Sequence, residues 1–164
     1  IVRLVGSEMC IRDRLSGLKQ SSGLAVDISK KAINMAKKNA LKHNICSRLK
    51  FSVKSFESIF NKKFDLIVSN PPYIDKKDIK NLSDDIKKYE PRIALDGGND
   101  GLDLIKKVIY KSKYILKKNG MLAIEIGNEQ IKKVSKILFD NNYRVKHLIK
   151  DYKTNVRCVI AINN

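Results

Sequence analysis

The chain has 164 residues and a formal net charge of +17 at pH 7, from 34 Lys and Arg against 17 Asp and Glu. This length predicts one domain with a hydrophobic core of its own. The sequence contains no run of about 20 apolar residues and no secretory signal pattern, which argues against membrane-spanning helices and predicts a cytoplasmic protein.

The cysteines and histidines show no pattern of a metal or redox site. The three cysteines form no CxxC pair, and the two histidines are isolated from them and from each other. These residues are Cys10, Cys46, Cys158, His43 and His147. We therefore expect reduced cysteines and no bound metal.

The large positive charge has two interpretations. It is typical of proteins with an acidic partner such as RNA. However, the lysines are spread evenly and interleaved with Asn and Ile, as codon bias also produces. The sequence has no arginine cluster and no aromatic ladder for stacking bases, so charge alone does not identify a nucleic-acid binder.

Short β-rich runs alternate with helical patterns from Gly23 onward, starting with an apolar run at residues 23–28 that ends in an acid. Ser29 is the expected N-cap of the helix that follows. The apolar residues that recur there at helical spacing are Ala32, Ile33, Ala36, Ala40 and Leu41. Residues 49–53 and 64–69 are predicted as strands, the second of them buried.

A long polar connection at residues 75–100 ends in the turn DGGNDG. Asn99 or Asp100 is expected to cap a helix that runs to about Lys118. The apolar face of this helix comprises Leu102, Ile105, Val108, Ile109 and Leu116. Gly120 suits the C-terminal end of the helix.

The last part of the chain predicts a buried strand at residues 121–127, a helix, and a hairpin of residues 144–149 and 156–162 that turns around Thr154 and Asn155. The inward residues of the helix are Ile131, Val134 and Leu138. Strands that alternate with helices predict an α/β fold with a mostly parallel sheet, to which the hairpin adds an antiparallel element at one edge.

Polar residues follow three of the predicted parallel strands. Asp27, Asn70 and Glu125 all stand at predicted strand ends. Ligands of such sheets bind outside the carboxyl ends of the strands, so we expect these residues to converge on one crevice.

The strand FDLIVS runs directly into Asn70-Pro71-Pro72-Tyr73. The Asn70 side-chain oxygen is an uncharged acceptor. Prolines lack an N–H and restrict the backbone, which leaves the Pro71 carbonyl as a second, fixed acceptor. Tyr73 offers a flat face against which a planar group stacks. Together these groups form a socket for a planar NH₂ group.

Amides and the exocyclic amines of bases carry such a group, and their delocalised lone pair makes the nitrogen a poor nucleophile. Two acceptors that hold its hydrogens position the nitrogen and favour the pyramidal geometry that frees the lone pair. No general base is needed before the transfer, because alkylation acidifies the proton that leaves.

Several strings in order resemble the protein-(glutamine) N-methyltransferases of the HemK/PrmC type. They are NPPYIDKKDI, YEPRIALDGGNDGLDLI, LAIEIGNEQ and KDYKTNVRCVIA, within residues 23–164. These enzymes belong to the class I methyltransferases, which use S-adenosylmethionine, and they methylate the glutamine of the Gly-Gly-Gln loop in peptide chain release factors. The resemblance implies a Rossmann-like, seven-stranded sheet.

The resemblance also implies the site residues. Asn70 and the Pro71 carbonyl hold the substrate amide beside the cofactor, and Pro72 and Tyr73 shape the socket. Asp27 binds the ribose hydroxyls of the cofactor, as acids at this position do in nucleotide folds. Ser55 or Phe56 stands where the family contacts the adenine. Glu90 and Glu125 are expected to organise loop and strand ends.

The N-terminus departs from the family pattern, which opens with a strand and a D-x-G-x-G-x-G loop. About 20 residues before Asp27 the chain reads LVGSEMCIRDR, with only Gly6 present and Glu8 in place of a close-approach glycine. VGSEMCIRDR also resembles translated sequencing-adapter read-through. Residues 1–14 are therefore expected to be non-native, with the first strand and the glycine loop missing or overwritten. Residues 15–164 then form a catalytic domain truncated at its N-terminus, with weak cofactor binding.

Alternative functions stay open at this point. A sibling enzyme methylates a glutamine of a large-subunit ribosomal protein, and DNA adenine N6-methyltransferases share the NPPY string. A catalytically idle basic binding module is the alternative outside the enzymes. The expected partner is a release factor as protein substrate, with indirect proximity to the ribosome or RNA, no membrane, and a monomeric state.

Overall fold

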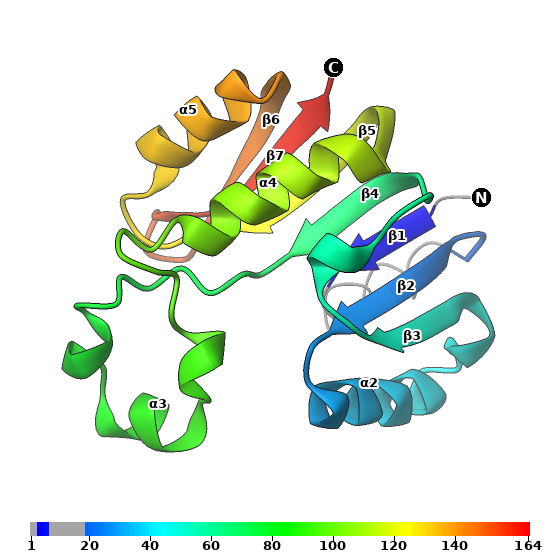
Figure 1. The fold of residues 1–164 in the computed structure, drawn as a ribbon, viewed down its shortest axis with the longest axis horizontal. Helices are drawn as coiled ribbons and strands as arrows, with labels where there is room; N and C mark the ends of the chain where they lie inside the picture. The colour runs from blue at the N-terminus through cyan, green and yellow to red at the C-terminus, as the bar shows by residue number, and fades with distance from the viewer. Residues whose placement is uncertain (1–2, 7–18) are drawn as a thin grey trace.

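The computed structural model describes the backbone of residues 3–6 and all of residues 19–164. Its strands form a seven-stranded sheet in the order β3-β2-β1-β4-β5-β7-β6 (Figure 1). The strands are β1 (Arg3–Gly6), β2 (Ser22–Asp27), β3 (Leu49–Val53), β4 (Phe64–Ser69), β5 (Leu116–Glu125), β6 (Tyr143–Lys150) and β7 (Val156–Asn163). The α-helices in the described part of the chain are α2 (Lys30–Lys42), α3 (Asp84–Tyr89), α4 (Asp103–Ile115) and α5 (Ile131–Asp140).

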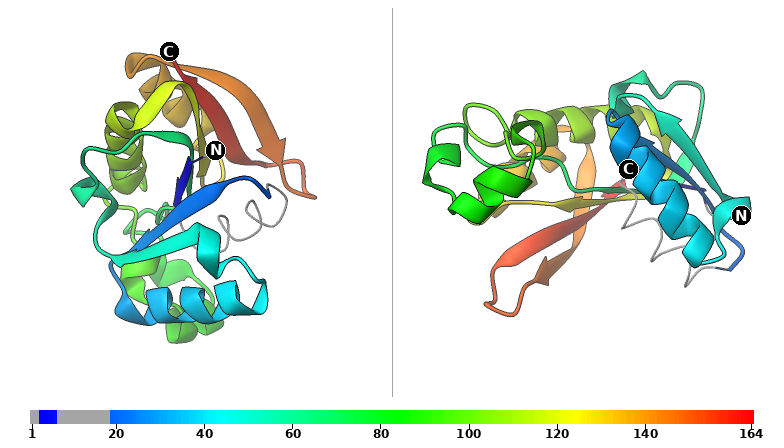
Figure 2. Two further views of the ribbon diagram at one scale, coloured as in Figure 1. Left: turned by 90° about the vertical axis from the view of Figure 1, so that its right-hand side faces the viewer. Right: turned by 90° about the horizontal axis from the view of Figure 1, so that it is seen from below.

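The first five strands in chain order pair in parallel, and the last two form an antiparallel hairpin. Strand β7 pairs with β5, so β6 becomes the edge strand. The hairpin curls out of the plane of the other strands (Figure 2). The mostly parallel α/β sheet with an antiparallel hairpin at one edge is thus confirmed, as is the number of seven strands.

The strand order reverses between β1 and β4, since the chain builds β2 and β3 on one side of β1 and then crosses to β4. In doubly wound sheets this switch point is where a crevice opens outside the carboxyl ends of the strands. The arrowheads of β1, β2 and β4 point to the same side of the molecule in Figure 1.

Helices cover the sheet on both faces. Alternate strand residues such as Leu24, Ile67 and Ile124 join the large core cluster with α4 and α5. Ala25 and Leu49 join a smaller cluster with Ala40 of α2. Because neighbouring strand residues point to opposite faces, α2 lies on the face opposite α4 and α5.

Several elements agree with the predictions made from local sequence signals. Strands β3 and β4 have the predicted bounds. Ser29 caps α2, with its hydroxyl accepting a hydrogen bond from the Ala32 N–H at 3.2 Å. Val134 and Leu138 of α5 are buried, as expected, and Ile131 is half-buried. The hairpin forms with Thr154 in its turn at φ 65°.

The bounds of α4 differ from the prediction. The helix begins at Asp103, and the Asp100 carboxylate instead accepts a hydrogen bond from the N–H of Leu102, at 3.0 Å. It ends at Ile115, because Leu116 pairs with Phe64 of β4 and so belongs to β5. Tertiary pairing therefore overrides a sequence that would continue the helix.

Gly120 does not end a helix, so that prediction is wrong. It lies within β5, near the irregular register between β4 and β5. A Cβ there would lie 2.9 Å from the carbonyl oxygen of Lys117 and 3.2 Å from that of Phe64. Glycine is required by this close approach of backbone.

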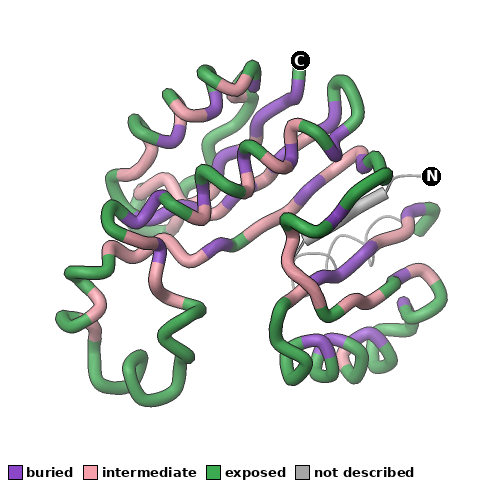
Figure 3. Tube along the Cα trace, viewed as in Figure 1, coloured by how far each residue is buried: buried purple, intermediate pink, exposed green. Residues whose placement is uncertain are grey.

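The polar connection after β4 is not a plain loop. Residues 75–96, called here the 75–96 lobe, contain the short helix α3 and two 3₁₀ turns, Ile79–Asn81 and Arg92–Ala94. The lobe extends from the edge at which β4 ends, and it is mostly exposed (Figures 1 and 3). Within residues 19–164, every helix is too short or too polar to cross a lipid bilayer.

Candidate active site

Strand register places Asp27, Asn70 and Glu125 at the same level of the sheet. Gly6 of β1 pairs with Ala25 on one side and with Val68 on the other. Asp27 and Asn70 each lie two residues further along their strands, and the register of β4 on β5 continues from Ser69↔Ile124 to Asn70 beside Glu125. The predicted row of polar strand ends thus exists at one edge of the sheet.

The spacing of this row follows from the strand order. Asp27 and Asn70 flank the end of β1, so their backbones are two strand spacings apart, or about 10 Å. Asn70 and Glu125 follow adjacent strands, about 5 Å apart. A nucleoside that lies across the end of β1 therefore has Asp27 at one side and Asn70 at the other.

Asp27 ends β2 and is half-buried. One carboxylate oxygen accepts a hydrogen bond from the Ser29 N–H at 2.7 Å, which orients the side chain at the entry to α2. Among residues 19–164, no donor is bonded to its second oxygen. Asp27 is thus both a helix-entry residue and a carboxylate with one oxygen available for a hydroxyl group.

Asn70 and Pro71 differ in exposure. Asn70 is exposed, and Pro71 behind it is buried. In the described part of the chain, neither the Asn70 side chain nor the Pro71 carbonyl has a hydrogen-bond partner. Both oxygens therefore keep lone pairs that no described residue uses, in a loop that is fixed by its neighbours.

Tyr73 is held through its hydroxyl group. This group donates a hydrogen bond to the Glu125 carboxylate at 3.2 Å. Burial first, and then the adjacent negative charge of Glu125, raise the pKa of Tyr73 above its ordinary value of 10. The hydroxyl is therefore protonated at neutral pH and serves as a donor that ties the loop to the end of β5. Glu125 organises a loop, as expected.

The turn at residues 95–101, called here the DGG turn, lies alongside the NPPY loop. The Ile74 N–H donates to the Leu95 carbonyl at 3.2 Å, and the Gly97 N–H donates to the Ile74 carbonyl at 2.9 Å. The Lys76 N–H then donates to the Gly98 carbonyl at 2.9 Å. Two strings that are more than 20 residues apart thus form one unit.

Ser55 and Phe56 follow β3, next to the end of β2, where the Lys54 N–H donates to the Asp27 carbonyl at 2.9 Å. The Ser55 hydroxyl accepts a hydrogen bond from the Glu57 N–H at 3.2 Å, and Phe56 packs against the main core. Glu90 instead lies exposed at the end of α3, so the structure does not bring it into the row.

Gln130 was not predicted as a site residue, although it belongs to the string LAIEIGNEQ. Its carboxamide oxygen accepts a hydrogen bond from the Gly127 N–H at 2.8 Å. Its NH₂ group donates to the carbonyls of Tyr73, at 3.0 Å, and of Gly101, at 3.2 Å. These two partners lie 57 and 29 residues away in the chain, so no local sequence pattern predicts the contacts. The only sequence signal for Gln130 was its place in the string LAIEIGNEQ.

The prediction for the N-terminus lies partly outside the described residues. Arg3–Gly6 forms β1, a strand that lies between β2 and β4 in the sheet. The expected glycine loop, including Glu8, falls in residues 7–18, of which nothing is described.

Comparison of the sequence with known proteins shows similarity to methyltransferases. A family model described as Eco57I restriction-modification methylase matches residues 17–156. The chain is 42% identical over 146 residues to the release factor glutamine methyltransferase of Fusobacterium nucleatum subsp. nucleatum, which covers 88% of this chain and 41% of that protein. It is 40% identical over 116 residues to the ribosomal protein uL3 glutamine methyltransferase of Francisella tularensis subsp. tularensis, over 69% and 36% of the two chains.

These similarities confirm the resemblance predicted from the motifs. The chain spans less than half the length of the two curated relatives. The crystal structure of ribosomal protein L11 methylase from Lactobacillus delbrueckii subsp. bulgaricus superposes with a TM-score of 0.69 at 18% identity, over 98% of this chain and 68% of that chain. The fold is that of the class I methyltransferases, whose cofactor is S-adenosylmethionine.

Proposed function

The chain belongs to the Eco57I restriction-modification methylase family, and we propose that it transfers a methyl group from S-adenosylmethionine to the side-chain amide of a protein glutamine. The observation that supports the proposal is the row of polar groups at the carboxyl ends of the parallel strands. It combines a half-buried carboxylate with one available oxygen, two uncharged acceptors at Asn70 and Pro71, and an anchored aromatic ring at Tyr73.

The cofactor fits one end of this row. The available oxygen of Asp27 suits a ribose hydroxyl group, and Ser55 and Phe56 flank the adenine side. When bound, S-adenosylmethionine supplies a methyl group carried on a positively charged sulfur. A neutral Asn70 places no formal negative charge next to that sulfur, so it leaves the methyl group reactive.

The substrate amide fits the other end. The Asn70 side-chain oxygen and the Pro71 carbonyl accept the two N–H hydrogens and orient the nitrogen lone pair towards the methyl carbon. Tyr73 covers one face of the planar group. When the nitrogen–carbon bond forms, the carbon–sulfur bond of the bound cofactor would break and leave its electron pair on the sulfur. The nitrogen then releases one proton to solvent, so no side chain of the row acts as a base.

The substrate protein is proposed to be a peptide chain release factor, methylated in its Gly-Gly-Gln loop. The relatives named for release factors and for ribosomal protein uL3 support glutamine in both cases, and they leave the protein that carries it to experiment. We propose adenine in DNA as the second candidate, because the family description is that of a restriction-modification methylase and an exocyclic amine fits the same two acceptors. We propose that the reaction occurs in the cytoplasm, and that the enzyme is a monomer with indirect proximity to the ribosome or RNA.

Residues 1–14 are proposed to be non-native and residues 15–164 to be the catalytic domain. An independent reading of the gene tests this proposal, because it predicts D-x-G-x-G-x-G in place of residues 4–10. As a protein-level test, Glu8→Gly together with Cys10→Gly restores three glycines at that spacing with Gly6. This variant is expected to bind S-adenosylmethionine more tightly than the unchanged chain.

Methyl transfer tests the proposed function directly. Radiolabelled S-adenosylmethionine is incubated with a release factor, with ribosomal protein uL3 or with an adenine-containing duplex, using both the chain and its glycine-restored variant. We expect label on the release factor glutamine. Asn70→Ala is expected to lower kcat at least about 100-fold while cofactor affinity stays within about threefold, because only the substrate nitrogen loses its acceptor.

Asp27→Ala is the complementary variant and is expected to weaken cofactor binding instead, as measured by calorimetry. If only the DNA duplex is labelled, the substrate is adenine and the glutamine proposal is wrong. The absence of transfer to all three substrates in both chains, or normal turnover by Asn70→Ala, would contradict the proposal.

A further inference from the structure

Gln130 connects three segments of the candidate site through one side chain. The carboxamide bonds to the backbone after β5 at Gly127, to the NPPY loop at Tyr73 and to the turn at Gly101. Three of the four hydrogen bonds that a carboxamide can make are thus used, each on a backbone group from a different segment.

We infer that Gln130 is a positioning residue that holds the NPPY loop, and with it the acceptor pair of Asn70 and Pro71, against the end of β5. The inference rests on the proposed function for its catalytic meaning. Its structural part rests on the hydrogen bonds that Gln130, Tyr73 and the DGG turn make in the structure.

Packing around the carboxamide supports a fixed arrangement. A Cβ on Gly101 would lie 2.4 Å from the Tyr73 carbonyl oxygen and 2.8 Å from the Gln130 amide nitrogen. A Cβ on Gly127 would lie 3.0 Å from the Gln130 amide oxygen and 3.1 Å from the Tyr73 ring. The three segments therefore approach too closely for a side chain at either glycine.

The carboxamide has a rigid base. Gln130 immediately precedes α5, and its carbonyl accepts the Val134 N–H at 2.9 Å. Val134 is fully buried in the main core. The backbone of Gln130 is thus anchored to α5, and its side chain holds the loop in a fixed position relative to that helix.

Tyr73 is held at two points. Gln130 bonds to its backbone carbonyl, and Glu125 bonds to its hydroxyl. Pro71 and Pro72 precede it with restricted backbone angles. Fixing Tyr73 therefore limits the directions in which the Asn70 side chain and the Pro71 carbonyl can point. Two acceptors that bind the same nitrogen need such fixed directions.

Gln130→Glu is the sharpest variant. A carboxylate has the same shape and still accepts the Gly127 N–H, but it cannot donate and faces two carbonyl oxygens. Gln130→Met removes all three bonds, including the one from the Gly127 N–H, without adding charge. Asn163→Asp is the matched control, because the Asn163 NH₂ group also lies near two backbone carbonyls, of Lys113 at 3.5 Å and Lys117 at 3.3 Å, away from the row.

Amide hydrogen exchange tests the structural part, with the N–H groups of Ile74 and Lys76 as reporters because they bond to the DGG turn. Both Gln130 variants are expected to exchange about tenfold faster there than the unchanged chain, and Asn163→Asp is expected not to. Unchanged exchange at Ile74 and Lys76 in both variants would overturn the inference, whether or not methyl transfer is observed.

The kinetic part separates positioning from simple stabilisation. In the glycine-restored chain, both Gln130 variants are expected to lower kcat on the glutamine substrate at least about tenfold, with cofactor affinity within about threefold. Asn163→Asp is expected to keep both constants at any temperature where it is folded. Faster exchange with unchanged kcat would leave Gln130 with a structural role only and would refute its positioning role. Absence of methyl transfer in the glycine-restored chain without a Gln130 substitution would count against the proposed function. The hydrogen-exchange result would still test whether Gln130 holds the NPPY loop.

Discussion

The Asn70 side chain offers an accepting oxygen without a negative charge. The neighbouring carboxylate of Glu125 explains why the absence of charge matters. Asn70 follows β4 directly beside Glu125, the carboxylate that engages Tyr73. A second carboxylate at position 70 would repel Glu125 and favour protonation of one of the two. The uncharged amide avoids this conflict, so the two neighbouring residues perform different tasks.

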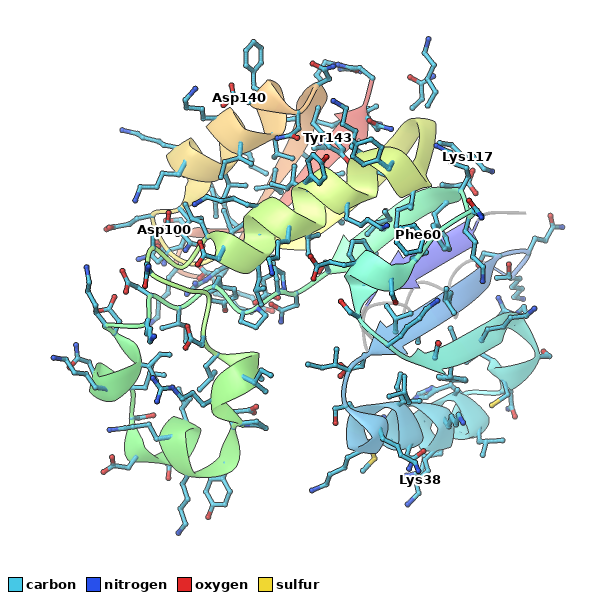
Figure 4. All side chains as sticks on the ribbon, in the orientation of Figure 1. Lys38, Phe60, Asp100, Lys117, Asp140 and Tyr143 are labelled. Carbon is cyan, nitrogen blue, oxygen red and sulfur yellow. The ribbon has the colours of Figure 1, made fainter. Side chains whose placement is uncertain are left out.

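Tyr143 shows how one buried hydroxyl group makes stability depend on pH. It is the first residue of β6, and its hydroxyl lies 2.8 Å from that of Ser112 on α4 (Figure 4). Ser112 donates to the Ile109 carbonyl at 2.9 Å, so Tyr143 supplies the hydrogen between the two hydroxyls. Burial raises the pKa of Tyr143 to about 12.

Because the folded pKa exceeds the unfolded value of about 10, this stabilisation is complete below pH 10 and is lost as pH rises towards 12. The free energy of unfolding of the unchanged chain is expected to fall by about 2–3 kcal/mol more across that range than that of Tyr143→Phe. Urea denaturation at each pH measures this difference. The control Tyr152→Phe changes a fully exposed ring and should follow the unchanged chain; equal slopes for all three proteins would contradict the prediction.

At the scale of elements, the turn at residues 95–101 supports the NPPY loop instead of forming a site itself. Gly98 and Gly101 both have positive φ, of 91° and 68°. Their surroundings differ, because a Cβ on Gly98 would meet the side chain of Asp103, whose carboxylate can rotate although its Cβ, at 2.8 Å, cannot. A Cβ on Gly101 would meet the Tyr73 backbone oxygen at 2.4 Å.

Gly98→Ala and Gly101→Ala are therefore a matched pair. Each is expected to lower the free energy of unfolding by about 1–2 kcal/mol, because alanine disfavours positive φ. Only Gly101→Ala should also displace Tyr73 and lower kcat for methyl transfer. Thermal denaturation and single-turnover assays measure the two effects, and equal kcat values for the two variants would show that the contact with Tyr73 is unimportant.

The 75–96 lobe is the element furthest from its predicted form. Ile86, Tyr89 and Ile93 are exposed on it, and its sequence is mostly polar. Neither a helical face nor a strand alternation is long enough there to be recognised. Its short helices depend instead on the bonds that join the ends of the segment, such as that between Ile74 and Leu95.

At the scale of the whole molecule, a net charge of +17 opposes the compact state. Every ion pair that the structure describes has an exposed basic side chain, as the pair of Lys136 with Asp140 does, so these pairs contribute little to offset the repulsion.

Raising the KCl concentration from 0.01 to 0.1 M shortens the Debye length from about 30 to about 10 Å. The midpoint of thermal unfolding is therefore expected to rise. Repeating the titration above pH 10, where lysines lose their charge, should reduce the rise. A midpoint that falls with salt at neutral pH would mean that ion pairs outweigh the repulsion.

The sequence by itself determined the α/β fold, the bounds of β3 and β4, the closing hairpin and the row of Asp27, Asn70 and Glu125. These features depend on neighbours within a few residues: apolar runs, caps, turn residues and the residue that ends each strand. The rule that parallel strands share one carboxyl edge then brings the row together.

Tertiary structure alone decided the end of α4, the form of the 75–96 lobe and the contacts of Gln130. Leu116 joins a strand because Phe64 pairs with it, and Gln130 matters because Tyr73 and Gly101 lie within reach of its amide. Such partners are distant in the chain, so no local pattern encodes them, and their hydrogen bonds exist only once the sheet has assembled.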